Sequence, residues 1–436
     1  MNFSQSAIFS VIASVGLLLI NLFVNVIQAR LLGPAEIGRF QIYITTQTYI
    51  STILALGIGQ SCIYFINALK INERRVLSSS INSTLLLAVI SGLGIFLLIS
   101  LNKKYFGNDS PIGVCLFSIG TSAMLISNVF TPVLLSKMEV VKNQIVKYST
   151  SILTLVVLLF VIAHGAHLDV SFLIGLIGCT NILSVLLLYY YFINRFSFRD
   201  KIDFYLLKEI VFYGVKLSGN NIASITLLSL PIYFLSWFST TDSASNVGYY
   251  GRANSLLVIG TVIASSIGPL LYSKWSGITR DNLKQQVRNF SLLFTILNVL
   301  VSILIVLTAP ILIKVIYGAD FLTSIPVLQI LSISIIANGF REICYGIFSS
   351  QGYPTKILKN LIIGIVISII ANYCIIPKFG VIGCACVTSF VSIITAWMLM
   401  IDVMKISSID YKDFFYLPSL SNIKDVIKSV FNKSIV

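Results

Sequence analysis

Long apolar stretches separated by short polar ones dominate this chain. Stretches of about 20 residues are long enough to cross about 30 Å of hydrocarbon as an α-helix, and twelve can be drawn within the 436 residues. The predicted spans cover residues 8–29, 40–68, 80–101, 111–135, 148–163, 168–192, 211–238, 250–273, 289–309, 321–348, 358–377 and 379–402. The connections are too short for an extramembrane domain. The pattern therefore predicts an all-α polytopic membrane protein.

The second half of the chain repeats features of the first. Gly175-Leu-Ile-Gly-Cys179 recurs as Gly380-Val-Ile-Gly-Cys384, and Ile37-Gly-Arg-Phe40 is echoed by Val247-Gly-Tyr-Tyr250. Six spans per repeat make the two halves parallel, and paired repeats of this kind enclose substrate at their interface. The sequence predicts two six-helix bundles and favours a transporter.

The repeat also sets the predicted division of the chain. Residues 1–194 form the first bundle, 195–210 a cytoplasmic linker, 211–404 the second bundle and 405–436 a cytoplasmic tail. In the tail, Ile423, Val426, Ile427, Val430 and Phe431 recur at helical spacing beside lysines. This pattern is typical of an amphipathic helix on anionic lipid headgroups, with a loosely ordered tail as the alternative.

The basic residues are distributed unevenly between the two sides of the predicted bundle. Of the 30 Lys and Arg residues, 21 lie in the even-numbered connections and the tail, and 7 in the odd-numbered connections. Cytoplasmic loops of membrane proteins accumulate Lys and Arg. Both termini are therefore predicted to be cytoplasmic, and the net charge of +14 indicates topology rather than a nucleic-acid partner.

Composition supports the membrane assignment and argues against an enzyme. Hydrophobic residues make up 56% and charged residues 11% of the chain, against about 45–50% and 25% in soluble domains. The only histidines, His164 and His167, share one short loop, and no phosphate-binding Gly-rich loop occurs. The seven cysteines are interpreted as small buried hydrophobes. We expect no catalytic residues, no metal and no cofactor, and transport driven by a gradient or the membrane potential.

Polar side chains inside the predicted spans recur at helical spacing. Asn21, Asn25 and Gln28 occupy positions i, i+4 and i+7, which places three amides on one face of the first span. Asn220 lies in the seventh span and Asn338 in the tenth. These residues are candidates to line a hydrated cavity and to bind substrate. Interhelical hydrogen bonding is the competing interpretation, because membrane bundles commonly use amides in this way.

Two cations lie inside apolar spans, where a charge costs about 3 kcal/mol or more without water or a partner. Lys216 and Arg341 are therefore candidate ligands for an anionic substrate group, and Arg252 at the start of span eight is a third. Glu342 is a candidate site for a coupling proton or Na⁺. The alternatives are that Lys216 and Arg341 extend to the nearby membrane interface and that Arg252 is an interface residue. For Arg39, a local structural role is favoured.

Three segments resemble one family. Ala29-Arg-Leu-Leu-Gly-Pro-Ala-Glu-Ile-Gly-Arg-Phe40, Val247-Gly-Tyr-Tyr250 and Phe379-Gly-Val-Ile-Gly-Cys-Ala385 are similar, in order and spacing, to segments of bacterial polysaccharide (O-antigen and capsule repeat-unit) flippases. These belong to the multidrug/oligosaccharidyl-lipid/polysaccharide (MOP) exporter superfamily. The resemblance covers nearly the whole chain. It implies two six-helix bundles around a central V-shaped cavity, in the bacterial plasma (inner) membrane.

The resemblance also implies a substrate. Such flippases move undecaprenyl-diphosphate-linked oligosaccharide from the cytoplasmic to the outer leaflet, and a polysaccharide polymerase and a chain-length regulator are candidate partners beside membrane lipids. Lipid II flippases are similar but carry arginines in span one, where this sequence has Leu18 and Val24. A peptidoglycan precursor is thus disfavoured. The rival functions are an ion-coupled multidrug exporter of the same superfamily and, less favoured, a membrane glycan polymerase.

Overall fold

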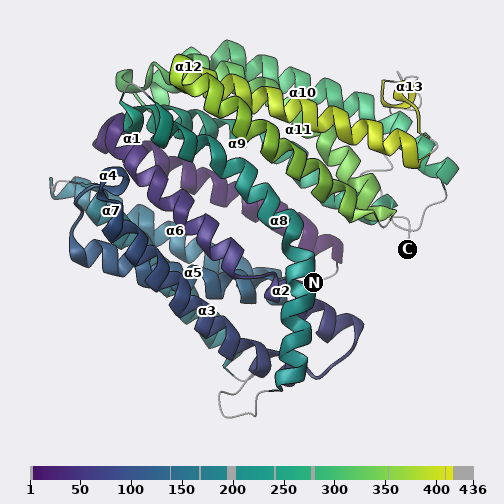
Figure 1. The fold of residues 1–436 in the computed structure, drawn as a ribbon, viewed down its shortest axis with the longest axis horizontal. Coiled ribbons are helices and arrows are strands. Elements are labelled where there is room, and N and C mark those ends of the chain that lie inside the picture. Colours follow the sequence, from purple (N-terminus) through teal and green to yellow (C-terminus); the bar gives the residue numbers. More distant parts are fainter. Residues whose placement is uncertain are drawn as a thin grey trace. The chain divides into compact units, whose positions relative to one another are not determined.

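The computed structural model describes residues 3–137, 139–165, 168–193, 203–239, 242–275, 280–351, 353–407 and 409–415. In these residues every regular element is helical (Figure 1). The long helices are α1 (Phe3–Leu54), α3 (Glu73–Leu101), α5 (Pro111–Ser136), α6 (Val140–Ala163), α7 (Val170–Phe192), α8 (Phe204–Phe238), α9 (Ser243–Trp275), α10 (Arg280–Ile316), α11 (Ser324–Ser350) and α12 (Pro354–Ile406). The short ones are α2 (Ile58–Ile63), the π-helix η1 (Tyr64–Ala68), α4 (Lys103–Phe106), the 3₁₀-helix η2 (Ala319–Phe321) and α13 (Tyr411–Phe414).

Two of the long helices each run from one predicted span into the next. In α1 the break is at Gly33, whose φ of 73° and ψ of 177° are not helical, and Pro34 follows it. In α12 the break is at Gly380, with φ 54° and ψ −134°, three residues after Pro377. Only glycine adopts such positive φ values readily, and proline removes a helical hydrogen bond. Each break therefore joins two spans without a loop.

The predicted spans are confirmed as helical, except that the span 40–68 is divided by a turn at residues 55–57 into the end of α1, α2 and η1. Among the described residues, nine helices are long and apolar enough to cross a membrane. Of these, α12 supplies two spans, α1 supplies the first span and the beginning of the second, and α9 accounts for the remaining predicted span. The predicted all-α polytopic fold is therefore correct.

The chain divides into two compact units. Unit 1 comprises Met1–Trp237 with Thr241–Gly248, and unit 2 comprises Phe238–Thr240 with Tyr249–Val436. α8 begins at Phe204, within the predicted linker, and the preceding linker residues 195–202 lie outside the described residues. The predicted amphipathic tail helix also lies outside them. The division at residues 194 and 211 stays a prediction.

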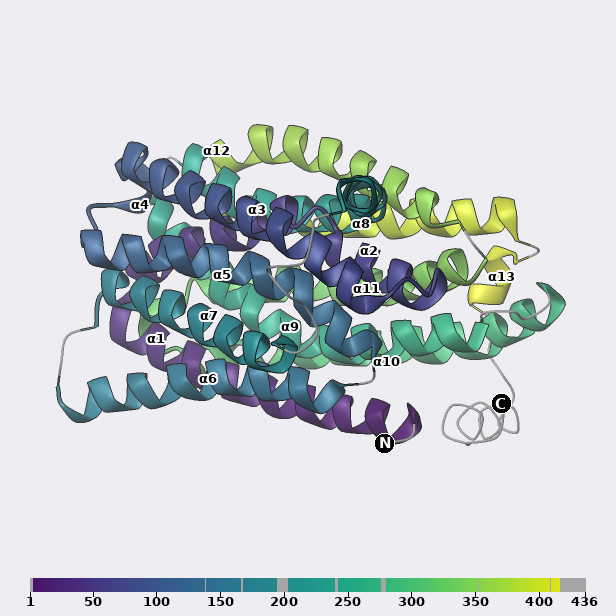
Figure 2. The same cartoon turned by 90° about the horizontal axis from the view of Figure 1, so that it is seen from below.

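Unit 1 is a bundle in which α3, α5, α6 and α7 run side by side (Figures 1 and 2). α5 packs against both α3 and α7. Buried apolar side chains such as Leu125, Val133 and Leu188 form the interior of the bundle. At one end of the bundle, Ser61 of α2 donates a hydrogen bond of 2.7 Å to the carbonyl oxygen of Ile210 in α8. Hydroxyl groups thus link helices where apolar packing alone gives little direction.

Repeat-related glycines meet inside unit 1. Gly38 of α1 and Gly248 of α9 hold equivalent positions in the two repeats. A Cβ atom on Gly38 would overlap the carbonyl oxygen of Ala244, and one on Gly248 would overlap that of Pro34. The two backbones can approach this closely only because both residues lack a side chain. The two similar segments are therefore also in physical contact.

Unit 2 is built around α11, which packs between α10 and α12. The Ser389 hydroxyl of α12 donates to the carbonyl oxygen of Ile330 at 2.8 Å. The short helix α13 docks on α10, where Ser291 donates to the carbonyl oxygen of Phe414 at 2.9 Å and Lys284 pairs with Asp413 at 3.4 Å. These contacts hold the last described residues onto the bundle.

Candidate functional site

The break at Gly33 divides α1 into two arms. The amides of the first arm, before Gly33, differ in their surroundings. Asn21 is exposed, and its Oδ1 accepts a hydrogen bond of 3.0 Å from the Ser151 hydroxyl of α6. Asn25 is half-buried and Gln28 is only 3% exposed. For Asn21 the interhelical role is therefore directly visible. The substrate-binding role of the three amides stays a prediction.

The predicted cation of α8 lies on an accessible face. Lys216 is exposed, and Asn220, one turn later, is half-buried. The large apolar side chain of Phe212, one turn before Lys216, is also exposed. In a membrane-spanning helix such a face meets lipid or a water-filled space. Lys216 is thus positioned to reach a ligand or the membrane interface.

An aromatic and hydroxyl cluster, which the sequence did not predict, connects the second arm of α1 to α8. The Thr226 hydroxyl donates to Tyr49 Oη at 3.3 Å, and the Tyr233 hydroxyl donates to Thr46 Oγ1 at 3.3 Å. The Tyr233 ring stacks on Trp237 with a centroid distance of 5.6 Å. Trp237 is 53% exposed, so one wide aromatic face is accessible. We call these residues the aromatic cluster.

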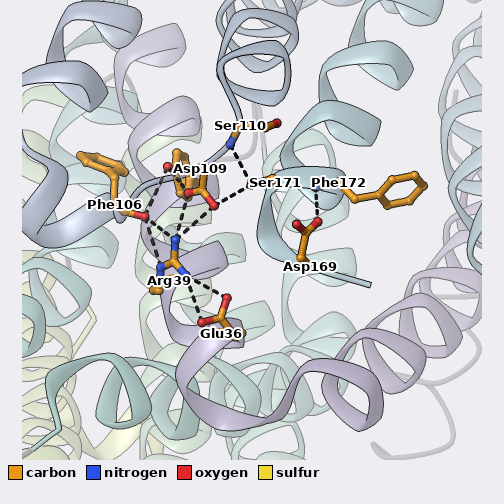
Figure 3. Close-up of polar contacts among 9 residues, drawn as sticks. Glu36, Arg39, Phe106, Asp109, Ser110, Asp169, Ser171 and Phe172 are labelled. Atoms are coloured by element: carbon orange, nitrogen blue, oxygen red, sulfur yellow. Dashed lines mark hydrogen bonds and ion pairs between the residues drawn. The ribbon is translucent and has the colours of Figure 1, made fainter. Parts of the chain in front are cut away.

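A dense network of hydrogen bonds surrounds Arg39 at one end of unit 1 (Figure 3). The guanidinium donates to both Glu36 carboxylate oxygens at 3.0 and 2.9 Å, to the Phe106 carbonyl oxygen at 2.9 Å and to Asp109 at 3.1 Å. The Asp109 carboxylate also accepts from the Tyr43 hydroxyl at 2.6 Å. The structural role expected for Arg39 is confirmed by these contacts.

The same network extends to the starts of two helices. The Ser171 hydroxyl of α7 donates to Asp109 at 2.9 Å and accepts from the backbone N–H of Ser110 at 3.0 Å. Asp169 caps α7 by accepting from the backbone N–H of Phe172 at 2.8 Å. Such caps satisfy backbone donors that a helix start leaves free. Asp109 thereby joins α1, α5 and α7 through one carboxylate.

A cavity of about 480 Å³ opens beside this network. Its lining includes the carboxylates of Glu36, Asp109 and Asp169 and the cations Arg39 and Lys104. With three carboxylates against two cations, its local charge is unfavourable for a diphosphate. Its acceptors suit hydroxyl or ammonium donors instead. This cavity was not predicted from the sequence, because its acidic residues lie in connections between the predicted apolar spans or, for Asp169, at the start of one.

Arg252 lies deep in unit 2 rather than at an open mouth of α9. The residue is 2% exposed, and the guanidinium lies over the ring of Tyr317 at 5.9 Å from its centroid. This is a cation–π arrangement, in which the negative ring face stabilises the cation. In this conformation Arg252 supports the packing of α9 and is not accessible to a large substrate.

The polar group of α11 is half-buried and incompletely paired. Asn338, Arg341 and Glu342 follow one another at i, i+3 and i+4 and are partly accessible. Asn338 Oδ1 and Arg341 Nε are buried and have no hydrogen-bond partner in the described part of the chain. Burying such a group without a partner costs about 1–3 kcal/mol, and more when it is charged. This is the predicted group with the most unused hydrogen-bonding capacity.

The structure assigns the predicted residues to two separate sets. Asn21, Asn25, Gln28, Lys216 and Asn220 belong to unit 1, and Arg252, Asn338, Arg341 and Glu342 to unit 2. Within the described residues no group of three or more His, Cys, Asp or Glu side chains could hold a metal ion. His164 is exposed at the end of α6, and His167 lies outside the described residues.

One expectation about the cysteines was wrong. All seven are free, but only Cys62, Cys344 and Cys384 are buried, and the other four are exposed. Apolar spans in a membrane protein present much of their hydrophobic surface to lipid. A cysteine in such a span is therefore as easily placed outward as inward.

The fold and the apolar helices define a multi-pass membrane protein. A structure of lipid II flippase MurJ in an inward closed conformation superposes with a TM-score of 0.73 at 16% identity, covering 97% of this chain and 92% of the flippase. An inward-facing multidrug resistance MATE family transporter of the MOP superfamily superposes with a TM-score of 0.68 at 15% identity, covering 90% and 95% of the two chains. The chain thus has the MOP-superfamily fold.

The family follows from the sequence itself. The family model described as "Polysaccharide biosynthesis protein" matches residues 4–272, more than half of the chain. The chain belongs to this family. An uncharacterized membrane protein of Methanocaldococcus jannaschii is 22% identical over 398 residues, which cover 84% of this chain and 77% of the relative.

Proposed function

We propose that this protein flips undecaprenyl-diphosphate-linked oligosaccharide repeat units from the cytoplasmic to the outer leaflet by alternating access. The observation that carries the proposal is membership of the polysaccharide biosynthesis family in a chain with the fold of MOP-superfamily transporters. A diphosphate needs cations, an oligosaccharide needs amides, hydroxyls and aromatic faces, and the lipid tail can stay in the bilayer. The chain offers each of these groups.

Arg341 is the proposed ligand of the diphosphate. Its Nε has no hydrogen-bond partner among the described residues, although the side chain is only partly accessible. A phosphate oxygen would satisfy this donor through a charge-assisted hydrogen bond. Asn338, one turn earlier on the same face, would add an amide contact. Lys216, which is exposed on α8, is the second proposed phosphate ligand, and Arg252 could contribute only after a rearrangement that releases it from Tyr317.

The sugar is proposed to contact unit 1. The aromatic cluster offers the accessible face of Trp237, against which the apolar C–H face of a pyranose ring can pack. The partly accessible hydroxyl groups of Thr226 and Tyr233 belong to the same cluster and can accept hydrogen bonds from sugar hydroxyls. Asn21, Asn25, Gln28 and Asn220 would extend the set of polar contacts. Such a mixture of aromatic surface and a few polar groups is typical of small-molecule sites.

Energy for transport is proposed to come from an ion gradient or the membrane potential. Glu342 is half-buried beside Arg341 on α11 and is the proposed site of the coupling proton or Na⁺. The proposed location is the bacterial plasma membrane, with both termini cytoplasmic as the distribution of Lys and Arg indicates. A polymerase and a chain-length regulator would then receive the flipped units.

The test is leaflet-resolved transport of undecaprenyl-diphosphate-linked oligosaccharide in proteoliposomes containing the full chain. Replacing Arg341 by Gln is expected to lower the transport rate about tenfold or more, since it removes a charged contact contributing about 1.5–3 kcal/mol. Lys314→Gln is the matched control, because Lys314 is an exposed cation at the end of α10. Equal rates for the two variants would remove Arg341 from the site. No transport above empty liposomes would reject the flippase.

The second candidate is an ion-coupled multidrug exporter, which the likeness to a MATE family fold favours. Deleting the gene would then increase susceptibility to lipophilic cations without interrupting surface polysaccharide. A membrane glycan polymerase is the weakest rival, and joining of repeat units by the purified chain would establish it.

A further inference from the structure

A small cavity with charged and apolar lining residues lies in unit 2 between the two arms of α12, away from Asn338, Arg341 and Glu342. The arms run from the break at Gly380 to the same end of unit 2 (Figure 1). The cavity has a volume of about 220 Å³. Its lining includes Lys359, Asn360 and Ile363 from the first arm, and Met398, Asp402 and Lys405 from the second.

Asn360 is a lining residue of this cavity whose side-chain amide has unused hydrogen-bonding capacity. The residue is 2% exposed, and neither its Nδ2 nor its Oδ1 has a hydrogen-bond partner among the described residues. A buried amide that forms no hydrogen bond is costly, and this amide lines the cavity. A ligand with both an acceptor and a donor would satisfy the two atoms together.

The charges around the amide restrict the ligand further. Lys359 and Lys405 are exposed at the cavity, and Asp402 is half-buried between the same two arms. Two cations and one carboxylate give a local charge of +1, which matches a monoanion. The carboxylate additionally favours a ligand that carries hydrogen-bond donors near its negative group.

The surroundings indicate that the ligand is a lipid. Ile363 and Met398 line the apolar side of the cavity. Next to them on the same arms, Ile362, Val366 and Trp397 are exposed large hydrophobic side chains. Both cations also belong to the side of the predicted topology that is cytoplasmic, where anionic lipids accumulate and where basic pockets between helices bind their headgroups.

We propose that this cavity binds the headgroup of phosphatidylglycerol, a monoanionic phosphodiester that carries two hydroxyl donors. Lys359 and Lys405 hold the phosphate, Asn360 donates to it and accepts from a headgroup hydroxyl, and Asp402 accepts from a hydroxyl. The acyl chains lie along the exposed apolar side chains of the α12 arms. A cavity of about 220 Å³ has room for such a headgroup and none for an oligosaccharide.

The test is native mass spectrometry of the full chain in detergent, titrated separately with phosphatidylglycerol, phosphatidylethanolamine, phosphatidylcholine and inorganic phosphate. Phosphatidylglycerol is expected to bind most tightly. Lys359→Gln and Lys405→Gln are each expected to weaken its binding about fivefold, since one Lys near an anionic lipid surface contributes about that factor. Asn360→Leu should weaken it as well.

Lys356→Gln is the matched control, because it removes the same charge one turn away on the same helix and Lys356 does not line the cavity. It should bind phosphatidylglycerol like the unaltered chain. The proposal is overturned if the control loses as much affinity as Lys359→Gln, if phosphatidylethanolamine binds equally well, or if inorganic phosphate alone displaces the lipid. Since Arg341 and the aromatic cluster play no part here, failure of this test leaves the proposed flippase untouched, and the reverse also holds.

Discussion

Removing the carboxylate of Asp109 should destabilise unit 1 by about 3 kcal/mol. The side chain of Asp109 is 5% exposed and accepts hydrogen bonds from Arg39, Tyr43 and Ser171, which belong to two different helices. In Asp109→Ala all three donors lose their acceptor at once. Tyr43 is 0% exposed, so water cannot easily replace the lost partner of its hydroxyl.

The size of the destabilisation depends on which hydrogen-bond acceptors each donor retains when Asp109 is replaced. Breaking a buried ion pair by removing one partner costs about 3–5 kcal/mol. Arg39 is 24% exposed at its side chain and retains Glu36 and the Phe106 carbonyl oxygen, which places its loss at the low end of that range. The Tyr43 hydroxyl retains only a long contact of 3.4 Å to the Phe106 carbonyl oxygen. We therefore expect about 3 kcal/mol for Asp109→Ala and about 1 kcal/mol for Asp109→Asn, whose amide oxygen can still accept from Tyr43.

Equilibrium unfolding of the full chain in mixed micelles measures these differences. Asp169→Ala is the matched control, because Asp169 lines the same cavity but accepts a single backbone hydrogen bond as a helix cap, which contributes about 1 kcal/mol. A double-mutant cycle with Arg39→Met then isolates the pair. The double variant should be less destabilised than the sum of the single variants by about 1–2 kcal/mol.

Two results would refute this reasoning. One is an Asp109→Ala variant no less stable than Asp169→Ala, which would mean that water satisfies the three donors. The other is strict additivity in the cycle, which would show that the Arg39 and Asp109 charges do not interact in the folded chain.

Two further predictions concern helix contacts in unit 1. Gly38→Ala should destabilise the chain by about 1–3 kcal/mol, the usual range for overpacking, because the new methyl group would overlap the carbonyl oxygen of Ala244. Gly94→Ala, a helical glycine with open space around it, should not destabilise it when the two variants are melted side by side. Asp203 accepts from the backbone N–H of Leu206 and from Arg75, and these contacts lower the pKa of its carboxyl group. Because this pKa is lower when folded, the stabilisation is present above the unfolded pKa and is lost as pH falls through the folded one. The protection of the amides at the start of α8, after correction for the intrinsic exchange rate at each pH, should therefore fall at acidic pH, and Asp203→Asn should remove that pH dependence.

The helices were predictable from the sequence because the length of an apolar stretch is a local property of the chain. The residues at which the helices end were not predictable in this way. Hydropathy marks the hydrocarbon boundary, and helices continue beyond it when caps are present. The seventh span was predicted to start at residue 211, but α8 begins at Phe204, where Asp203 accepts the Leu206 N–H at 3.1 Å. The connection expected between the spans 8–29 and 40–68 is a break at Gly33 inside one helix, because a single glycine with positive φ redirects the chain.

The contacts of the polar residues could not be predicted, because their partners lie far away in the sequence. Arg252 was expected near an open mouth, yet Tyr317, 65 residues later, covers it. Tyr49 and Tyr233 are likewise brought together only by the packing of α1 on α8, with ring centroids 6.1 Å apart. Periodicity places residues on a face of a helix. It carries no information about what that face meets.

Hydrogen-bond satisfaction provides the missing criterion for separating structural polar groups from binding groups. Arg39 uses its donors on Glu36, Phe106 and Asp109, so a ligand could gain its guanidinium only by breaking existing bonds. Arg341 Nε and both amide atoms of Asn360 have no partners within the described residues, so a ligand there gains contacts without that loss. Its charge inside an apolar span made Arg341 a candidate, whereas Asn360, which also lies in a predicted span, was not selected from the sequence. Unused hydrogen-bonding capacity selects both residues, and the anions proposed for them differ: a diphosphate for Arg341 and a bilayer phosphodiester for Asn360.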